Sequence, residues 1–126
     1  FEYYKAIDIS QEMCKLHPKT NNVELFCFDF DSEDFFKNIS KERYDMVLSS
    51  SALQWSKNIE NLVYHLSCVT ENINVALFTS NTFKTIQNIT KESSPILSQD
   101  KIKQVFSKYF DCKFEILNYK LEFTNK

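Results

Sequence analysis

One stretch near the middle of the sequence gathers the residues best suited to bind a ligand. Residues 44–55 read YDMVLSSSALQW, in which an apolar run at 46–48 is followed by three serines at 49–51 and then by Gln54 and Trp55. This pattern is typical of a buried parallel strand whose carboxyl end opens into a loop. In open α/β sheets, ligands bind in the crevice outside those carboxyl ends. We therefore expect the serines at the mouth of a pocket, with Gln54 and Trp55 just beyond.

An aspartate ends a strand-like segment at the start of the sequence. Residues 1–9 (FEYYKAIDI) are rich in aromatic and β-branched residues, which is typical of a strand, and they end in Asp8 and Ile9. Ser10 is a typical N-cap of a helix that should end before Pro18, because proline disfavours helical geometry at the preceding residue. The residues alone therefore favour Asp8 as an acid of a turn or a helix terminus.

A second strand-like segment leads into an acidic loop. Residues 23–28 (VELFCF) have the composition of a strand, and the residues after them include Asp29, Asp31, Glu33 and Asp34. An acidic run on a surface turn is usually solvated, or it caps the following short helix, whose N-terminus favours negative charge. We assign Asp31, Glu33 and Asp34 to these structural roles, because a metal site would need a histidine or the glycine of a calcium loop.

Helices and strands alternate along the rest of the sequence. A helix over 56–69 and a second one capped by Ser98 are predicted by apolar residues at helical spacing, namely Ile59, Leu62, Val63, Leu66 and Val69, then Ile102, Val105, Phe106, Tyr109 and Phe110. We expect a strand at 74–80, a short helix at 83–89, and an antiparallel edge strand at 117–123, where apolar and polar residues alternate. The order predicts an α/β fold with a mostly parallel sheet and helices on both faces.

Composition excludes several classes of protein. The 126 residues carry a net charge of −2 and are 43% hydrophobic, which suits one soluble domain with one core. Apolar runs fall far short of the roughly 20 residues that span a bilayer, and a signal-peptide pattern is absent. We therefore expect a cytoplasmic protein without a membrane partner. Nucleic acid is not an expected partner either, because the sequence has no basic cluster.

Cysteines and histidines give no sign of a reactive or metal-binding site. Wide spacing between Cys14, Cys27, Cys68 and Cys112 indicates neither a zinc site nor a disulfide framework, so we expect buried, reduced thiols. His17 and His65 lack a serine, cysteine or acid at a recognisable spacing. Both are predicted to be partly buried structural residues.

The sequence contains no glycine, where an average composition would supply about nine. Glycine is the default residue for left-handed turns and for close approach of the backbone to a ligand, so we expect asparagine to serve at many turns. Its absence also excludes a glycine-rich phosphate or dinucleotide loop within these residues. Because the sequence begins at Phe1 and not at methionine, we expect it to be a piece of a longer product.

The stretch YDMVLSSSALQW resembles the fourth-strand motif of class I S-adenosylmethionine (SAM) dependent methyltransferases. Its Leu-Gln-Trp ending is most similar to that of the malonyl-acyl-carrier-protein O-methyltransferases of biotin synthesis (BioC type). Residues 1–9, 23–28 and 74–80 resemble the second, third and fifth strands in order, with an asparagine-rich turn at 70–74 where the family usually has Pro-Gly-Gly. The resemblance implies a Rossmann-like α/β fold of the methyltransferase type, incomplete at both ends, with residues 1–126 as a single partial domain.

The resemblance implies a cofactor site for SAM. Asp8, with Ile9 beside it, would accept hydrogen bonds from both ribose hydroxyls, since a carboxylate offers two acceptor oxygens. Asp29 would contact the adenine amino group, and the backbone N–H of Phe30 would meet a ring nitrogen. The part of the site near the methionine end of SAM would come from the following strand, at Ser49 and Ser50.

The implied reaction esterifies the free carboxyl of a malonyl group carried by acyl-carrier protein. Gln54 and Trp55 would face this substrate, although Trp55 is as readily a lid over the core. A carboxylate is already a nucleophile and the sulfonium is already activated, so alignment and desolvation suffice and no catalytic base is expected. Acyl-carrier protein is acidic, and one helix offers either a basic docking face or ordinary solvated lysines, at Lys101, Lys103 and Lys108.

Two parts of the family pattern have no match in the sequence, namely the first strand with its glycine-rich loop and the last strand. Without the first strand the two halves of the sheet cannot pair in the usual order, and unpaired edges could support a dimer. We therefore expect weak or absent SAM binding by these 126 residues. Two other interpretations stay open: a non-catalytic, methyltransferase-like remnant or partner-binding module, and a methyltransferase that acts on another small-molecule acceptor.

Overall fold

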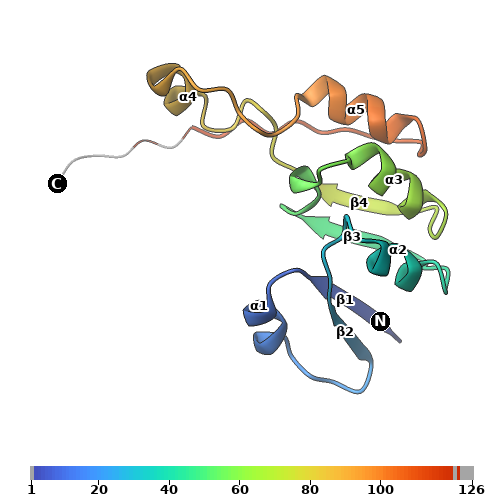
Figure 1. The fold of residues 1–126 in the computed structure, drawn as a ribbon. Helices are drawn as coiled ribbons and strands as arrows, with labels where there is room; N and C mark the ends of the chain where they lie inside the picture. Colours follow the sequence, from blue (N-terminus) through green and yellow to red (C-terminus); the bar gives the residue numbers. More distant parts are fainter. Residues whose placement is uncertain (1, 121, 123–126) are drawn as a thin grey trace.

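Short strands and helices alternate along the chain, as the sequence predicts (Figure 1). A computed structural model describes residues 2–120 and 122. Its elements are β1 (Tyr4–Asp8), α1 (Gln11–Leu16), β2 (Val23–Cys27), α2 (Glu33–Ile39), β3 (Val47–Ser50), the 3₁₀ helix η1 (Leu53–Trp55), α3 (Ile59–Ser67), β4 (Ile73–Ala76), α4 (Lys84–Thr90) and α5 (Gln99–Ser107). The predicted α/β class is therefore confirmed.

The described strands form two parallel pairs and not one continuous sheet. In the first pair Asp8 of β1 lies opposite Cys27 of β2, and in the second Ser50 of β3 lies opposite Ala76 of β4. The carboxyl ends of the strands lie on the left side of the molecule in Figure 1. The expected parallel sheet is thus present only as two halves that share no described ladder. This separation agrees with the expectation that the halves do not pair in the usual order.

A nearly buried lysine joins the two halves. Lys5 of β1 has a side chain that is 5% exposed, and its Nζ lies 3.6 Å from a carboxylate oxygen of Glu42. The same ammonium group lies 5.5 Å from the centre of the Tyr44 ring. Glu42 and Tyr44 both belong to the segment that leads into β3. The first strand pair is therefore attached to the second by a buried cation with an anionic and an aromatic partner.

Serine and asparagine side chains begin most of the helices, by accepting hydrogen bonds from backbone N–H groups of the first turn. These caps are Ser10 for α1, Ser32 for α2, Asn58 for α3 and Ser98 for α5, with donor–acceptor distances of 3.1 to 3.3 Å. The predicted caps Ser10 and Ser98 are confirmed, and α1 ends before Pro18 as predicted. The helix expected over 56–69 is shorter, because Ser56 ends η1 before Asn58 begins α3.

The core lies where α2, α3 and α5 meet the second strand pair. Its buried members include the predicted stripe of α3, with Leu62 and Val63 at 0% exposure, and Ile102, Val105 and Phe106 of α5. Tyr109 and Phe110 are partly buried against it. Each such side chain contributes roughly 1.5–3 kcal/mol of transfer free energy. The two helical stripes read from the sequence are therefore confirmed as the centre of the core.

Two expectations about the strands are wrong. The run at 46–48 is not fully buried, because Met46 is 48% and Leu48 58% exposed while Val47 packs against the core. Successive strand side chains point to opposite faces, and in both β3 and β4 every second residue is exposed. Among the described residues, helices therefore cover one face of the second strand pair, and not both faces as the sequence predicted. The strand expected at 117–123 is absent from 117–120 and 122, where no described strand lies beside it to pair with its backbone; positions 121 and 123 lie outside the described residues.

The expected use of asparagine at left-handed turns is also wrong for the described residues. The positions with positive φ are Ser51 at 56°, Phe83 at 59° and Lys91 at 63°. Asn72 instead uses its side chain, whose Nδ2 donates to the backbone oxygen of Asp45 at 3.0 Å. Asparagine here stabilises a turn through its amide group and not through unusual backbone geometry.

The thiols are more exposed than expected. All four cysteines are free; Cys27 and Cys68 are exposed, whereas Cys14 and Cys112 are half-buried. The expectation of buried thiols is therefore wrong for Cys27, at the end of β2, and for Cys68, at the C-terminus of α3, because element ends face solvent here. Among the described residues, no helix has the length and apolar character needed to cross a membrane.

Candidate functional site

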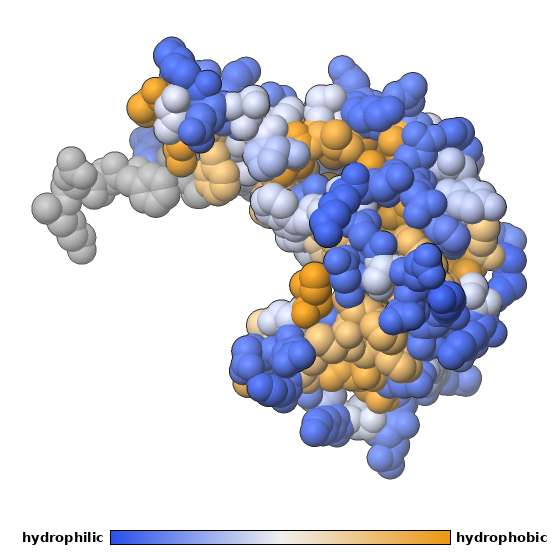
Figure 2. Space-filling model, viewed as in Figure 1, coloured by the Kyte–Doolittle hydropathy of each residue, from blue (hydrophilic) through white to orange (hydrophobic). Residues whose placement is uncertain are grey.

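The carboxyl ends of the strands border a hollow in the molecular surface. Figure 2 shows this hollow on the side to which the strands point in Figure 1, with hydrophobic residues on part of its wall. The residues singled out from the sequence lie at or just after these strand ends: Asp8 ends β1 and Ile9 follows it, Asp29 and Phe30 come after β2, and Gln54 and Trp55 come after β3. The topology thus brings the sequence-predicted residues to one side of the molecule.

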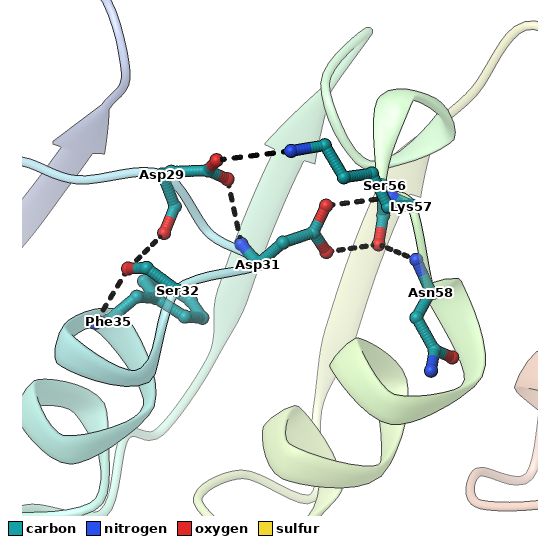
Figure 3. A network of polar contacts seen from close by, with 7 residues as sticks. All are labelled: Asp29, Asp31, Ser32, Phe35, Ser56, Lys57 and Asn58. Atoms are coloured by element: carbon teal, nitrogen blue, oxygen red, sulfur yellow. Dashed lines mark hydrogen bonds and ion pairs between the residues drawn. The ribbon is translucent and has the colours of Figure 1, made fainter.

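Asp31 ties the loop after β2 to the loop that leads into α3. One carboxylate oxygen accepts a hydrogen bond from the Ser56 hydroxyl, and the other accepts one from the backbone N–H of Lys57 at 2.7 Å (Figure 3). Ser56 Oγ also accepts a hydrogen bond from the N–H of Asn58, at 3.2 Å, at the start of α3. The loop that carries Asp29 is therefore fixed beside the turn that carries Gln54 and Trp55.

Asp29 is held by its own loop. Its Oδ1 accepts a hydrogen bond from the N–H of Asp31 at 2.9 Å, and its backbone oxygen accepts one from the Ser32 hydroxyl at 2.6 Å (Figure 3). Its other carboxylate oxygen lies 4.0 Å from Nζ of Lys57. Phe30, the next residue, is partly buried against the core. The carboxylate is thus oriented by one backbone N–H, with an exposed lysine as its counter-ion.

Asp8 closes a local turn at the end of β1. Its Oδ1 accepts a hydrogen bond from the backbone N–H of Ser10 at 2.7 Å, and its backbone oxygen accepts one from the N–H of Phe28 at 3.0 Å. The turn role favoured by the residues alone is therefore confirmed. The register places Asp8 opposite Cys27, two residues before Asp29, so the two aspartates lie at the ends of neighbouring strands.

A shallow cavity lies between α1 and the first strand pair. Its volume is about 340 Å³, and its lining includes Ile7, Asp8, Met13, Cys14, His17 and Leu25. Asp8 is the acid of a lining that is otherwise mostly apolar. This shallow cavity therefore places a fixed carboxylate beside apolar side chains at the end of β1.

The serines lie differently from what the sequence suggests. Ser49 and Ser50 are still part of β3, which runs two residues past the apolar run, so only Ser51 lies beyond the strand end. Ser51 has a left-handed backbone, and its N–H donates to the backbone oxygen of Ala76 at 2.8 Å. The expected serine loop is therefore a strand end, because pairing with β4 continues through Ser50.

Gln54 and Trp55 have opposite environments although they are neighbours in η1. Gln54 is 5% exposed, and neither its Nε2 nor its Oε1 has a hydrogen-bond partner. Trp55 is 59% exposed and so does not close over the core as a lid. A buried amide without a partner costs about 1–3 kcal/mol, and groups of this kind call for an explanation in a folded protein.

Other sequence candidates take structural roles. His65 stacks on Phe36 with ring centres 4.1 Å apart, and His17 lies against Tyr4 at 5.9 Å; both histidines are half-buried, as predicted. Glu33 and Asp34 stand in the first turn of α2, as predicted for helix-capping acids. Within residues 2–120 and 122, no group of three or more His, Cys, Asp or Glu side chains could hold a metal ion.

The lysines of α5 are only partly available as a docking face. Lys108 pairs with Glu60 of α3, and Nζ of Lys103 lies 5.8 Å from the centre of the Phe114 ring. Lys101 donates to the side chain of Gln104 at 3.4 Å. These three lysines thus have neighbours within the chain, and Lys101 and Lys108 are exposed.

The hydrogen bonds that join Asp31 to Ser56 and Lys57 were not predicted from the sequence. Asp31 was assigned to solvent or to the cap of α2, but Ser32 caps that helix and Asp31 reaches across to the start of α3. No spacing rule links residues this far apart, so only the fold could bring them together.

In comparisons with known proteins, the sequence matches no protein-family model and no curated protein.

Proposed function

We propose that this chain belongs to a SAM-dependent O-methyltransferase of the biotin-synthesis type, which transfers a methyl group to the free carboxyl of a malonyl group on acyl-carrier protein. The observation that carries the proposal is the pair of hydrogen bonds that the Asp31 carboxylate accepts from Ser56 and Lys57. It holds the loop of Asp29 and Phe30 beside the turn of Gln54 and Trp55, while Asp8 ends the strand next to β2. The residues that match the cofactor and acceptor positions of the resembled family thus lie at the carboxyl ends of β1 and β2 and in the turn after β3, which supports the proposal.

In this proposal the two aspartates bind the nucleoside part of SAM. The Oδ1 atoms of Asp8 and Asp29 each accept one backbone hydrogen bond, which fixes the carboxylates in place. Each carboxylate keeps acceptor capacity for ligand hydroxyl or amino groups, because an ionised carboxyl can accept several hydrogen bonds. The partly apolar cavity beside Asp8 offers a surface for the ribose.

The buried, unpartnered amide of Gln54 favours binding of the methyl acceptor near η1. Both polar atoms of this amide are buried without a partner, which lowers the stability of the fold, and a ligand carboxylate or carbonyl would accept a hydrogen bond from Nε2. Transfer itself needs only that the acceptor carboxylate and the methyl group be aligned away from water. We therefore assign Gln54 to orientation of the acceptor and no residue to proton transfer.

The absence of glycine limits what these residues can do for the methionine part of SAM. Every residue carries a Cβ, so no segment here offers the unobstructed backbone that a glycine-rich loop gives. We accordingly expect weak SAM binding by residues 1–126 alone.

The test is a titration of SAM, up to millimolar concentration, into the purified ¹⁵N-labelled chain, followed by NMR. The proposal expects shifts at Asp8, Asp29 and their neighbours that Asp8→Ala abolishes and Asp34→Ala, an exposed acid of α2, does not. A folded chain whose spectrum does not respond to SAM at millimolar concentration would overturn the assignment of the cofactor site to Asp8 and Asp29 in residues 1–126. A micromolar dissociation constant would support the activity and show that the glycine-rich loop is dispensable.

A second candidate is a non-catalytic, partner-binding module. It is favoured by the apolar side chains exposed around α4, where Phe83 is 71%, Ile86 56% and Ile89 75% exposed. Surface apolar residues that gather in one place often mark interaction sites. The same titration separates the candidates, because a module of this kind predicts a folded chain that does not respond to SAM.

A further inference from the structure

Two thiols meet at the carboxyl end of the first strand pair. Sγ of Cys14, in α1, lies 3.7 Å from the backbone oxygen of Asp8 and 3.9 Å from that of Phe26. Sγ of Cys27, the last residue of β2, lies 3.5 Å from the backbone oxygen of Ile9. Since Asp8 is the register partner of Cys27, and the two sulfurs lie against the backbone oxygens of the consecutive residues Asp8 and Ile9, both thiols lie at one strand end.

We propose that Cys14 and Cys27 are a redox-active dithiol, which a small-molecule disulfide such as oxidised glutathione converts to an intramolecular disulfide. The inference is independent of the proposed methyltransferase function, which makes no use of either thiol. Because both sulfurs already lie against the backbone of Asp8 and Ile9, closure needs Cys14 and Cys27 to approach each other to the S–S bond length of about 2 Å.

The two thiols differ in a way that sets the order of the steps. Cys27 is exposed, whereas Cys14 is half-buried. Burial, with help from the neighbouring Cys27 thiol, raises the pKa of Cys14 above its ordinary value of 9.0. The reactive species is the thiolate, and access to it governs the rate of exchange. Cys27 is therefore the attacking residue and Cys14 the resolving one.

The reaction balances without a metal or an enzyme. The thiolate of Cys27 attacks one sulfur of glutathione disulfide, forms a mixed disulfide and releases one glutathione thiolate, which takes up the proton that Cys27 lost. Cys14 then attacks the Cys27 sulfur and releases the second glutathione, which takes up the proton of Cys14. In sum, two protein thiols are oxidised to one disulfide, and one glutathione disulfide is reduced to two thiols.

The new bond would join α1 to the end of β2, across the turn formed by Asp8 and Ile9. α1 forms one wall of the cavity that Asp8 lines, so its position relative to the strands would become covalently fixed. Reduction would release it. The dithiol thus offers a reversible attachment of the wall beside this carboxylate.

The test uses the full chain in redox buffers of reduced and oxidised glutathione. Cys68→Ser/Cys112→Ser leaves only the proposed pair, and Cys14→Ser/Cys27→Ser leaves a control pair, Cys68 at the end of α3 and Cys112 beyond α5. After rapid alkylation, intact mass separates a disulfide, which has lost two hydrogen atoms, from glutathione adducts. We expect the first variant to form the Cys14–Cys27 disulfide. Its effective thiol concentration should be at least ten-fold above the roughly millimolar value that is typical of two groups joined by a flexible linker. The control pair should give glutathione adducts.

Wild-type chain treated in the same way keeps the proposal testable if a variant fails to fold. Peptide mapping of its oxidised form should find Cys14 joined to Cys27, and circular dichroism should show that the oxidised chain is folded. Two glutathione adducts on Cys14 and Cys27, a disulfide between other cysteines, or closure only in denaturant would each overturn the proposal. Because the readout is the state of the thiols, the outcome does not depend on SAM binding.

Discussion

The carboxylate of Asp31 and the backbone N–H of Lys57 form a hydrogen bond of 2.7 Å between residues that are 26 positions apart. The second carboxylate oxygen binds the Ser56 hydroxyl, so both oxygens are used at the start of α3. Hydrogen bonds to charged groups are shorter and stronger than neutral ones. This contact connects the loop after β2 to the second strand pair, and Lys5 makes a second connection at the other end of β1.

Asp31→Asn should lower the free energy of unfolding by about 1–3 kcal/mol. The carboxylate accepts two hydrogen bonds, from Ser56 and Lys57, whereas the NH2 group of asparagine cannot accept one, so one of the two bonds is lost. Urea unfolding followed by circular dichroism measures the change. Asp34→Asn is the matched control, since Asp34 is an exposed acid in the first turn of α2. Equal losses in the two variants would show that the contact across the loops contributes nothing.

Gln54→Met should raise the free energy of unfolding by about 1 kcal/mol, because it removes a buried amide that has no partner and keeps the side-chain volume. The same variant should weaken binding of a malonyl thioester, if Gln54 orients the acceptor as proposed. Stability is read from urea unfolding, and binding from an NMR titration with a malonyl thioester. A variant that loses stability would mean that Gln54 has hydrogen-bond partners in solution.

Gln87→Met is the matched control for that substitution. Nε2 of Gln87 donates to the backbone oxygens of Ser80 and Thr82, each at 2.8 Å, so its amide stabilises the segment before α4. Removing it should lower the free energy of unfolding, where the change at Gln54 raises it. Opposite signs from the same chemical change would isolate the role of the hydrogen-bond partners.

Helices and helix starts were predicted correctly where the pattern that identifies them lies within a few neighbouring residues. Helical spacing identified the buried faces of α3 and α5, and the side chains of Ser10 and Ser98 identified two helix starts. These features succeed because periodicity and capping depend on neighbours in the sequence. The candidate residues Asp8 and Asp29 were placed correctly at strand ends for the same reason.

Features that depend on partners far apart in the sequence could not be predicted from it. The alternating residues at 117–120 form no strand, because alternation shows which faces differ but not whether a neighbouring strand exists. Asp31 was one of several loop acids until the fold brought Ser56 and Lys57 to it. The exposure of Leu48 likewise depends on which face of β3 the helices cover.

Lys91→Gly should raise the free energy of unfolding by about 1 kcal/mol. Lys91 ends α4 with φ of 63°, a left-handed geometry that is strained for a residue with a side chain and unstrained for glycine. Lys84→Gly, at the other end of the same helix, should instead lower stability by roughly 0.5–1 kcal/mol, because glycine is entropically costly inside a helix. The pair of thermal or urea unfolding curves tests the sign, and a loss at both positions would contradict the left-handed geometry.

The ion pair between Glu60 of α3 and Lys108, at the end of α5, should make stability depend on pH in a defined window. The hydrogen bond from Lys108, followed by its charge, lowers the pKa of Glu60 below its ordinary value of 4.5. The same hydrogen bond raises the pKa of Lys108 above its ordinary 10.5. A lowered carboxyl pKa stabilises the fold above 4.5, and this contribution disappears as pH falls through the lowered value. The lysine's contribution disappears as pH rises through its raised pKa.

Glu60→Gln should therefore lower the urea midpoint near pH 7 and have a smaller effect near pH 2, because the wild-type carboxyl gains its proton as the pH falls below 4.5 and through its lowered pKa. The difference near pH 7 should shrink in about 1 M salt, since screening weakens a pair this exposed to solvent. Glu92→Gln, an exposed acid just beyond α4, provides the comparison and should show little dependence on either condition. If Glu60→Gln lowered the midpoint equally at both pH values, the side chain's packing and not its charge would be what stabilises the contact between α3 and α5.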